Sequence, residues 1–282
     1  MFRWLDGQLA SGKWELTRAE LENYSFEGER IPLLDRNRGI RNPADFTSSL
    51  TVMTSAKGHP YEDAVLDGGM IRYSYRAQDG GDNKKLVAAF QHRDPIVYFQ
   101  GIRNGVYVAH YPVYIVENLP EQRCVMLAVD EIFRFFGDPL KMTGDARRYS
   151  ERITRARLHQ PLFRARVMHA YEGTCAVCSL KHAELLDAAH IVGDLEDGGL
   201  AIVQNGLALC KIHHAAYDRN LLGITPDYEV RIDRDLLDEV DGPMLRHGLQ
   251  DMHRRALSVP QRKVDWPDRH RLAARFEQFN GA

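Results

Sequence analysis

Alternating apolar and polar positions dominate the first half of the chain. Between residues 46 and 116 they recur with the period of two that is typical of strands, in TSSLTVMTS, MIRYSY, PIVYFQGI and VYVAHYPVYIV. Asn104 and Gly105 separate the last two stretches, and Asn-Gly favours a hairpin because both residues tolerate a positive φ. With a helix expected over 129–137, this region is predicted to be a compact β-rich domain.

Helical patterns lie on either side of these strands. The stretch 17–34 pairs an apolar stripe with charges and predicts a helix that ends before Pro32. Residues 138–145 contain Pro and Gly and are expected to be a linker. Two helices should follow over 146–166, separated at Pro161, and 270–279 fits an amphipathic helix. The tail from 234 to 282 either packs on the second domain or forms a dimer contact.

Composition narrows the class of protein. A chain of 282 residues is expected to form about two domains, and 44% hydrophobic residues support ordinary globular cores. No apolar run reaches the roughly 18 residues of a membrane helix, and the first residues are no signal peptide. Four cysteines, with Cys124 alone in an apolar run, favour a reducing cytoplasm over a disulfide scaffold. No GxxxxGK[ST] loop is present, so an NTP-driven translocase is not expected.

The low net charge of the chain indicates that any binding of nucleic acid depends on local basic clusters. A net charge of -2 excludes a histone-like basic coat, so any nucleic acid must be bound by local clusters. One cluster lies at 146–166, which holds seven arginines and one acidic residue. Phosphate binding is the favoured interpretation, through Arg147, Arg148, Arg155 and Arg164. The basic loop at 35–43 is equally well explained as a solvated surface.

Three cysteines and a histidine have the spacing of a metal site. Cys175-x2-Cys178 is followed, after 31 residues, by Cys210-x2-His213. Two ligand pairs at this spacing can each hold one side of a tetrahedral zinc ion, so the four residues predict a closed structural zinc site.

Three polar residues within the same segment are not needed for the zinc. His190, Asn205 and His214 stand in AAHI, NGLALC and HHAAYD, and this combination resembles the zinc-stapled HNH endonucleases. The resemblance implies a ββα-metal fold. It also implies that His190 is the general base, that Asn205 pins the loop, and that His214 holds a catalytic divalent cation, Mg²⁺ or Mn²⁺. From spacing alone, the roles of His213 and His214 could be exchanged.

One position departs from the family pattern. Many HNH enzymes carry Asp or His immediately before the base, as a second cation ligand, but this chain has Ala189 there. Asp187 shares a strand face with Ala189, one repeat earlier. Coordination of the catalytic cation is therefore the point at which the chain differs from its relatives.

A second resemblance lies in the β-rich domain. Residues 59–73, HPYEDAVLDGGMIRY, resemble the base-pocket motif of SRA domains, which flip a modified cytosine between two aromatic rings. Tyr61 and Tyr73 match the ring positions. The family's base-reading Asp falls at Ala64, so Asp63 would replace it, and Tyr75 could line the rim. The alternative is an ordinary β-barrel whose tyrosines pack in the core.

Together these patterns predict an α+β protein. An N-terminal β-barrel-like SRA (PUA-like) domain (1–145) is expected to precede a zinc-stapled ββα-metal (HNH) domain (146–282). The function implied by the two resemblances is a McrA-like, type IV restriction endonuclease of the bacterial cytoplasm. It would flip 5-methylcytosine or 5-hydroxymethylcytosine and cut nearby double-stranded DNA, as a homodimer and without NTP. The alternatives are a non-catalytic modified-DNA-binding protein and an HNH endonuclease specific for unmodified sequence.

Overall fold

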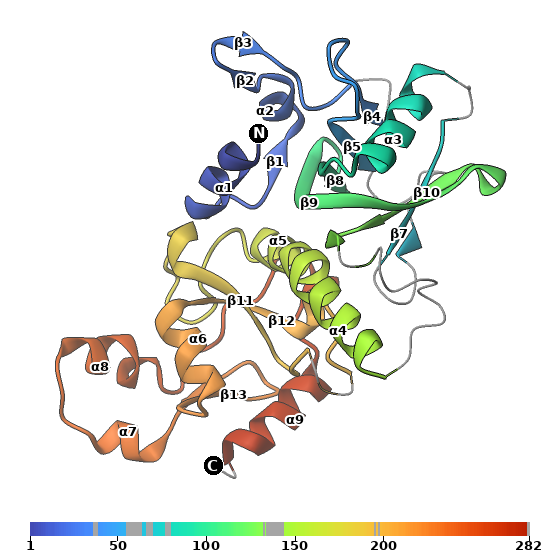
Figure 1. The fold of residues 1–282 in the computed structure, drawn as a ribbon. Coiled ribbons are helices and arrows are strands. Elements are labelled where there is room, and N and C mark those ends of the chain that lie inside the picture. The colour runs from blue at the N-terminus through green and yellow to red at the C-terminus, as the bar shows by residue number, and fades with distance from the viewer. Residues whose placement is uncertain are drawn as a thin grey trace. The chain divides into compact units, whose positions relative to one another are not determined.

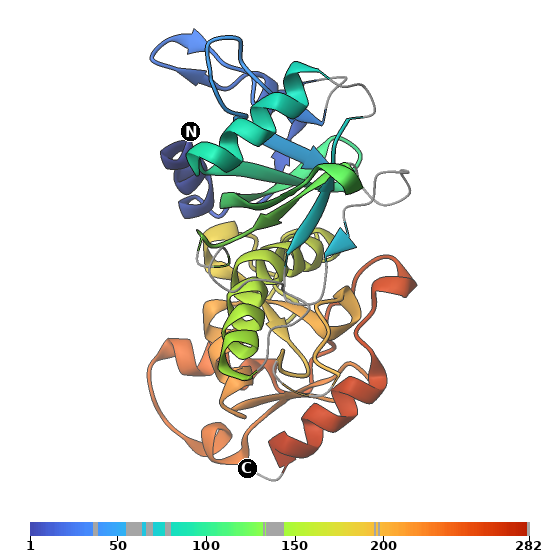
Figure 2. The same ribbon diagram turned by 45° about the vertical axis from the view of Figure 1, so that its right-hand side comes forward.

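The computed structural model describes residues 1–35, 39–54, 64–65, 70–76, 80–131, 133, 144–194, 196 and 198–280. The chain folds into two compact units. The first comprises Met1–Leu9 and Lys13–Leu162, and the second comprises Ala10–Gly12 and Phe163–Ala282. The division between the units therefore lies after residue 162, whereas the boundary predicted from the sequence lies after residue 145. The two differ because the first arginine-rich helix belongs to the N-terminal unit. Figures 1 and 2 give two views of the chain.

The first unit begins with short elements, α1 (Phe2–Ala10), β1 (Leu16–Thr17) and α2 (Arg18–Glu22). Thr17 and Glu20 form a capping box at the start of α2, which satisfies free N–H groups of its first turn. The helix predicted over 17–34 is wrong beyond Glu22. There the chain turns into a hairpin of β2 (Ser25–Phe26) and β3 (Glu29–Arg30), with positive φ at the two residues between them.

A sheet forms the centre of the first unit. Along it, the described strands follow the order β4-β5-β8-β9-β10-β7-β6, and β1 also pairs with β9. Their bounds are β4 (Ile40–Arg41), β5 (Thr51–Thr54), β6 (Ala64–Val65), β7 (Ile71–Ser74), β8 (Ile96–Arg103), β9 (Val106–Leu119) and β10 (Cys124–Ala128). The four predicted strands are confirmed as β5, β7, β8 and β9, and Gly105 makes the β8–β9 turn with a φ of 70°.

The sheet curls at its longest strand. β9 pairs with β8 through its first half and with β10 through its second half, and the register shifts in both ladders. β8 is covered on both faces. Ile96 and Tyr98 join one core cluster with residues of α3 (Gly81–His92), and Val97 and Phe99 join another with residues of α1. Burial on both faces explains why the first half of β8, Ile96–Phe99, is an uninterrupted apolar run and lacks the alternation expected from the sequence.

The arginine-rich segment forms α4 (Gly144–Thr154), a π-helical turn (Arg155–His159) and α5 (Gln160–Ala170). The break predicted at Pro161 thus occurs as a widened turn just before it. A proline clashes with the carbonyl four residues earlier, which is that of Arg157. The Arg157 carbonyl instead accepts a hydrogen bond from Nδ1 of buried His110, 3.1 Å away. The helix expected over 129–137 falls largely outside the described residues.

The second unit is built on a hairpin and a helix, β11 (Leu186–His190), β12 (Gly206–Cys210) and α6 (Lys211–Asp218). β13 (Leu222–Ile224), β14 (Val230–Ile232), α7 (Arg234–Asp238), α8 (Pro243–Gly248) and α9 (Arg269–Asn280) follow. The predicted C-terminal helix is α9, and it packs on its own unit. Arg275 donates hydrogen bonds to the Tyr217 carbonyl and to Asn220, at the end of α6. None of the described helices is long and apolar enough to span a membrane.

Candidate active site and zinc site

The four predicted zinc ligands lie together in the second unit. The sulfur atoms of Cys175, Cys178 and Cys210 and a ring nitrogen of His213 are all within 4.8 Å of one another. Three thiols and one imidazole match the donor set of a closed tetrahedral zinc site. A hydrogen bond from Cys210 lowers the pKa of Cys175, so one thiolate forms readily in this cluster. The residues present therefore fit a structural Zn²⁺.

The orientation of His213 supports this assignment. Its Nε2 lies 2.8 Å from the Gly248 carbonyl, which can only accept, so the proton resides on Nε2. Nδ1 is left with its lone pair toward Cys210 and Cys175, whose sulfur atoms are 3.1 and 3.5 Å away. A carbonyl that fixes the tautomer of a ligating histidine is common at zinc sites. Gly248 ends α8, so the tail also supports the zinc site.

Asn205 fixes the loop between the two strands of the hairpin. Its side chain is fully buried, and its Oδ1 accepts a hydrogen bond from the Val192 N–H at 2.9 Å. Its Nδ2 donates to the Val192 and Leu200 carbonyls, both at 3.0 Å. Val192 lies two residues after His190, so these bonds hold the chain where it leaves β11.

His190 ends β11 and lies flat against α5. Its ring stacks on Phe163, with 3.9 Å between the centroids and 13° between the planes. A Cβ on Gly206, the strand partner of His190, would lie 2.4 Å from Val167 and 3.0 Å from Phe163. Only glycine at this position lets α5 approach so closely. Phe163 is a site residue that the sequence analysis missed, because nothing in the sequence links it to His190.

The environment of His190 suits a neutral base. Burial lowers the pKa of its imidazole, and the nearby His214 lowers it further, while Asp194 acts in the opposite direction. Its Nε2 is buried and has no hydrogen-bond partner among the described residues. A histidine that stays neutral below its ordinary pKa of 6.5 can accept a proton throughout the physiological range.

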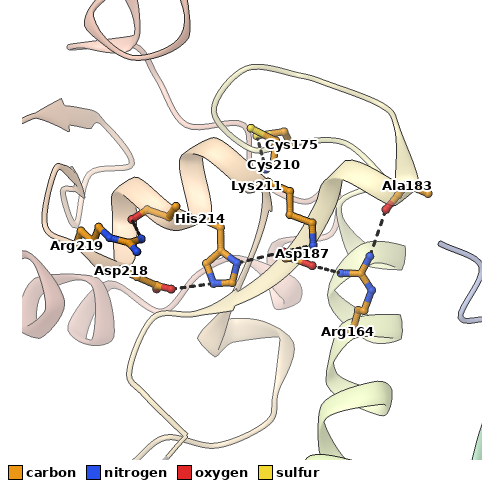
Figure 3. A network of polar contacts seen from close by, with 10 residues as sticks. Arg164, Cys175, Ala183, Asp187, Cys210, Lys211, His214, Asp218 and Arg219 are labelled. Atoms are coloured by element: carbon orange, nitrogen blue, oxygen red, sulfur yellow. Dashed lines mark hydrogen bonds and ion pairs between the residues drawn. The ribbon is translucent and has the colours of Figure 1, made fainter. Parts of the chain in front are cut away.

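His214 lies between two carboxylates, as Figure 3 shows. Its Nδ1 is 3.5 Å from Oδ2 of Asp187 on β11, and its Nε2 is 3.4 Å from Oδ2 of Asp218, one helical turn along α6. Adjacent ligands of an octahedral Mg²⁺ are about 3 Å apart, so both pairs have nearly the spacing needed. Asp218 was missed in the sequence, although its place four residues after His214 could have identified it.

Asp187 carries more contacts than His214 alone. Its Oδ1 accepts a hydrogen bond from Arg164 at 3.1 Å, and its Oδ2 accepts one from Lys211 at 2.6 Å. Burial by itself raises the pKa of Asp187, but Lys211, Arg164 and His214 together bring it below its ordinary value. Asp187 is therefore the anionic centre of this side of the helix (Figure 3).

The predicted phosphate contacts have different surroundings. Arg164 is largely buried and is held by Asp187 and by the Ala183 carbonyl. Arg148 is exposed on α4 and forms an ion pair with Asp145 at 2.8 Å. The side chains of Arg147 and Arg155 lie outside the described part of the chain. Arg164 thus belongs to the cluster around His214, while Arg148 lies in the other unit.

The residues predicted for a base pocket are only partly described. Tyr61 and Asp63 lie outside the described residues. Tyr73 is 5% exposed in a core cluster, and its hydroxyl donates to the Gly39 carbonyl at 2.8 Å. The Tyr75 hydroxyl donates to Asn118, and burial raises its pKa. Tyr73 therefore packs in the core of the first unit in this conformation.

Comparison with known proteins identifies the domain around His190. Residues 175–225 match the family described as HNH endonuclease, and this span holds the zinc ligands, His190, Asn205 and His214. This segment is therefore similar to HNH endonuclease domains. Within it, the hairpin and helix carry every residue that the family resemblance singled out.

Two solved structures are similar to longer parts of the chain. The "Modification dependent TagI restriction endonuclease" is 16% identical over 86% of this chain and 85% of its own, with a TM-score of 0.31. The "Type IV phosphorothioation-dependent restriction endonuclease ScoMcrA" is 15% identical over 64% of this chain and 54% of its own, with a TM-score of 0.24. Scores this low carry no weight for the fold. A comparison with curated proteins gives no match.

Proposed function

We propose that this protein is a divalent-metal-dependent DNA endonuclease that acts on DNA carrying modified cytosine. The nuclease activity in this proposal rests on one observation, the position of His190. Its ring is fixed by Phe163, its pKa is lowered by burial, and it ends β11, a strand that contacts α6. Hydrolysis of a phosphodiester needs such a base to take a proton from water.

The cation would be held by His214 with Asp187 or Asp218. One nitrogen and hard carboxylate oxygens suit Mg²⁺ or Mn²⁺, which prefer few protein ligands and leave room for water and phosphate. When bound, the cation supplies stabilisation of charge on the phosphate and its leaving oxygen. Asp187, on the face of Ala189, takes the role that Asp or His immediately before the base has in many HNH enzymes.

The remaining polar residues position these two. Asn205 holds the loop that follows His190 through three hydrogen bonds. The zinc site joins the Cys175–Cys178 turn to the start of α6, where Cys210 and His213 lie, and so fixes the helix that carries His214. Both roles place the base and the cation ligand on rigid backbone.

The N-terminal unit is proposed to read the modified base. The proposal rests on the motif at 59–73, in which Tyr61 and Asp63 would contact a flipped 5-methylcytosine or 5-hydroxymethylcytosine. Because Tyr73 packs in the core, its contact with the base requires β7 to open locally. We propose that the enzyme acts as a homodimer in the bacterial cytoplasm, without NTP, since one HNH site cuts one strand.

A second function is favoured by one observation. Asp187 is engaged by Arg164 and Lys211, and Ala189 has no ligand atom, so a non-catalytic modified-DNA-binding protein would also carry these residues. A third candidate, cleavage of unmodified sequence, would need no base pocket.

One cleavage assay distinguishes the three. The zinc-loaded protein is incubated with Mg²⁺ or Mn²⁺ and one DNA prepared with cytosine, 5-methylcytosine or 5-hydroxymethylcytosine. Cutting confined to modified DNA is expected. Equal cutting of all three would keep the nuclease and refute the reading of modified bases, whereas tight binding of modified DNA without cutting would establish the binding protein.

A further inference from the structure

The candidate site for the divalent metal ion already contains a positively charged side chain, that of Lys211. Oδ2 of Asp187 lies 2.6 Å from the Lys211 ammonium and 3.5 Å from Nδ1 of His214. The carboxylate oxygen nearest the cation-binding nitrogen is therefore already occupied by a positive charge. Figure 3 shows Lys211 and His214 converging on Asp187 from α6.

The two cations on Asp187 differ in how firmly they are held. The Arg164 side chain is 13% exposed and also donates to the Ala183 carbonyl. The Lys211 side chain is 54% exposed and sits on a flexible stem of four carbons. Arg164 uses the other carboxylate oxygen, Oδ1, so it can remain when Oδ2 changes partner. Lys211 is thus the exchangeable partner of Asp187.

Charge makes that exchange necessary. A divalent cation held by His214 and Oδ2 of Asp187 would lie within a few ångströms of the ammonium, where like charges repel. Lys211 lies three residues before His214, so both side chains project from the same face of α6. An ammonium released from Asp187 would remain beside the bound cation, where phosphate is expected to lie.

We propose that Lys211 is a competing counter-ion that becomes a phosphate contact. In the cation-free protein its ammonium neutralises Oδ2 of Asp187, and when the divalent cation binds, the ammonium moves to the DNA backbone. This inference rests on the proposed function, because it uses the cation site at His214. As a consequence, the Lys211 ammonium disfavours binding of a divalent cation to the free protein. The site forms fully only when both the cation and DNA are bound.

When the charge of Lys211 is removed, the proposal predicts tighter binding of Mn²⁺ and weaker binding of DNA. Mn²⁺ binding to the full-length, zinc-loaded protein without DNA is measured from the electron paramagnetic resonance of free Mn²⁺. Lys211→Met should tighten Mn²⁺ binding on the order of 3- to 10-fold, because it removes the competitor. Lys211→Arg should stay close to wild type, and Lys263→Met, an exposed lysine of the same unit, is the matched control.

DNA binding in Ca²⁺, measured in a His190→Ala background, should weaken in the same Lys211→Met variant. The slope of log affinity for DNA against log salt concentration should become shallower by the amount that corresponds to about one phosphate contact. Zinc content shows that the neighbouring Cys210 ligand is intact, and Lys211→Gln replaces Lys211→Met if the latter fails to fold. A purely structural lysine would weaken both affinities.

The outcomes separate this inference from the proposed function. If His214→Ala leaves Mn²⁺ affinity unchanged, the cation site itself is wrong. If His214→Ala abolishes binding but Lys211→Met leaves it unchanged or weaker, the competition is refuted while the cation site stands. If Mn²⁺ binding tightens but the salt slope is unchanged, the transfer of Lys211 to phosphate is refuted.

Discussion

Asn205 offers a sharp test of how the active-site loop is held. Asn205→Ala removes one acceptor and two donors from a fully buried site. Each hydrogen bond contributes about 0.5–1.5 kcal/mol net, so the loss should be about 2–4 kcal/mol of the free energy of unfolding of the second unit. Asn205→Asp should cost more, because it keeps the bond from the Val192 N–H but directs an anionic oxygen at two carbonyls.

The Asn205→Asp variant also carries a pH signature. Burial against carbonyl oxygens raises the pKa of a carboxyl group above its unfolded value of about 3.9. A carboxyl whose folded pKa is raised destabilises the fold increasingly as pH rises above the unfolded pKa. The gap in stability between Asn205→Asp and Asn205→Ala should therefore widen from pH 5.5 to pH 8.

The assay uses the tryptophans of the chain. Of the three, Trp4 and Trp14 belong to the first unit and Trp266 to the second. In a Trp4→Phe, Trp14→Phe background, urea unfolding followed by fluorescence reports on the second unit through Trp266. An Asn205→Ala loss below 1 kcal/mol, or an Asp variant more stable than the Ala variant at pH 8, would refute the role assigned to Asn205.

Three further predictions follow from the same unit. With saturating Mg²⁺, the cleavage rate should stay level as pH falls to 6.5 and decline only below it, because burial lowers the pKa of the base His190; a decline centred above 6.5 would contradict this. Removing zinc with a chelator, or by Cys178→Ser, should shift the unfolding of Trp266 to lower urea and leave the first unit unchanged. Gly206→Ala should destabilise the second unit by about 1–3 kcal/mol through its clash with Val167, and Val167→Ala should restore part of that loss if the clash is the cause.

Much of the fold could be predicted from patterns among residues that are adjacent in the sequence. Apolar patterning located β5, β7, β8 and β9, although β8 proved to be an uninterrupted apolar run, and the Asn-Gly turn located the β8–β9 hairpin, because both signals depend on residues adjacent in sequence. The helix predicted over 17–34 was wrong because charge and apolar spacing do not show where the backbone turns at Glu27 and Gly28. The unit boundary depends on which core a helix joins, and α4 joins the first through Ile153.

The candidate site shows the same division. Cys175, Cys178, Cys210 and His213 were predicted as one cluster because ligand spacing is local within each pair. Phe163 could not be predicted, since its stack on His190 joins a helix to a strand end far along the chain. Lys211 was likewise missed, because its significance comes from the Asp187 carboxylate across the hairpin. Contacts of this kind follow only from tertiary packing.

The most direct test of the central claim is the single-turnover nicking rate of 5-methylcytosine-containing plasmid in Mn²⁺, comparing wild type with His190→Ala. A positioned general base contributes about 10²- to 10⁴-fold, so the variant should be slower by at least about 100-fold. Its zinc content and its Trp266 unfolding midpoint are measured alongside. Loss of cutting in a folded, zinc-loaded variant is the predicted result. Cutting at the wild-type rate would contradict the assignment of His190 as the base and, with it, the catalytic mechanism proposed for this domain.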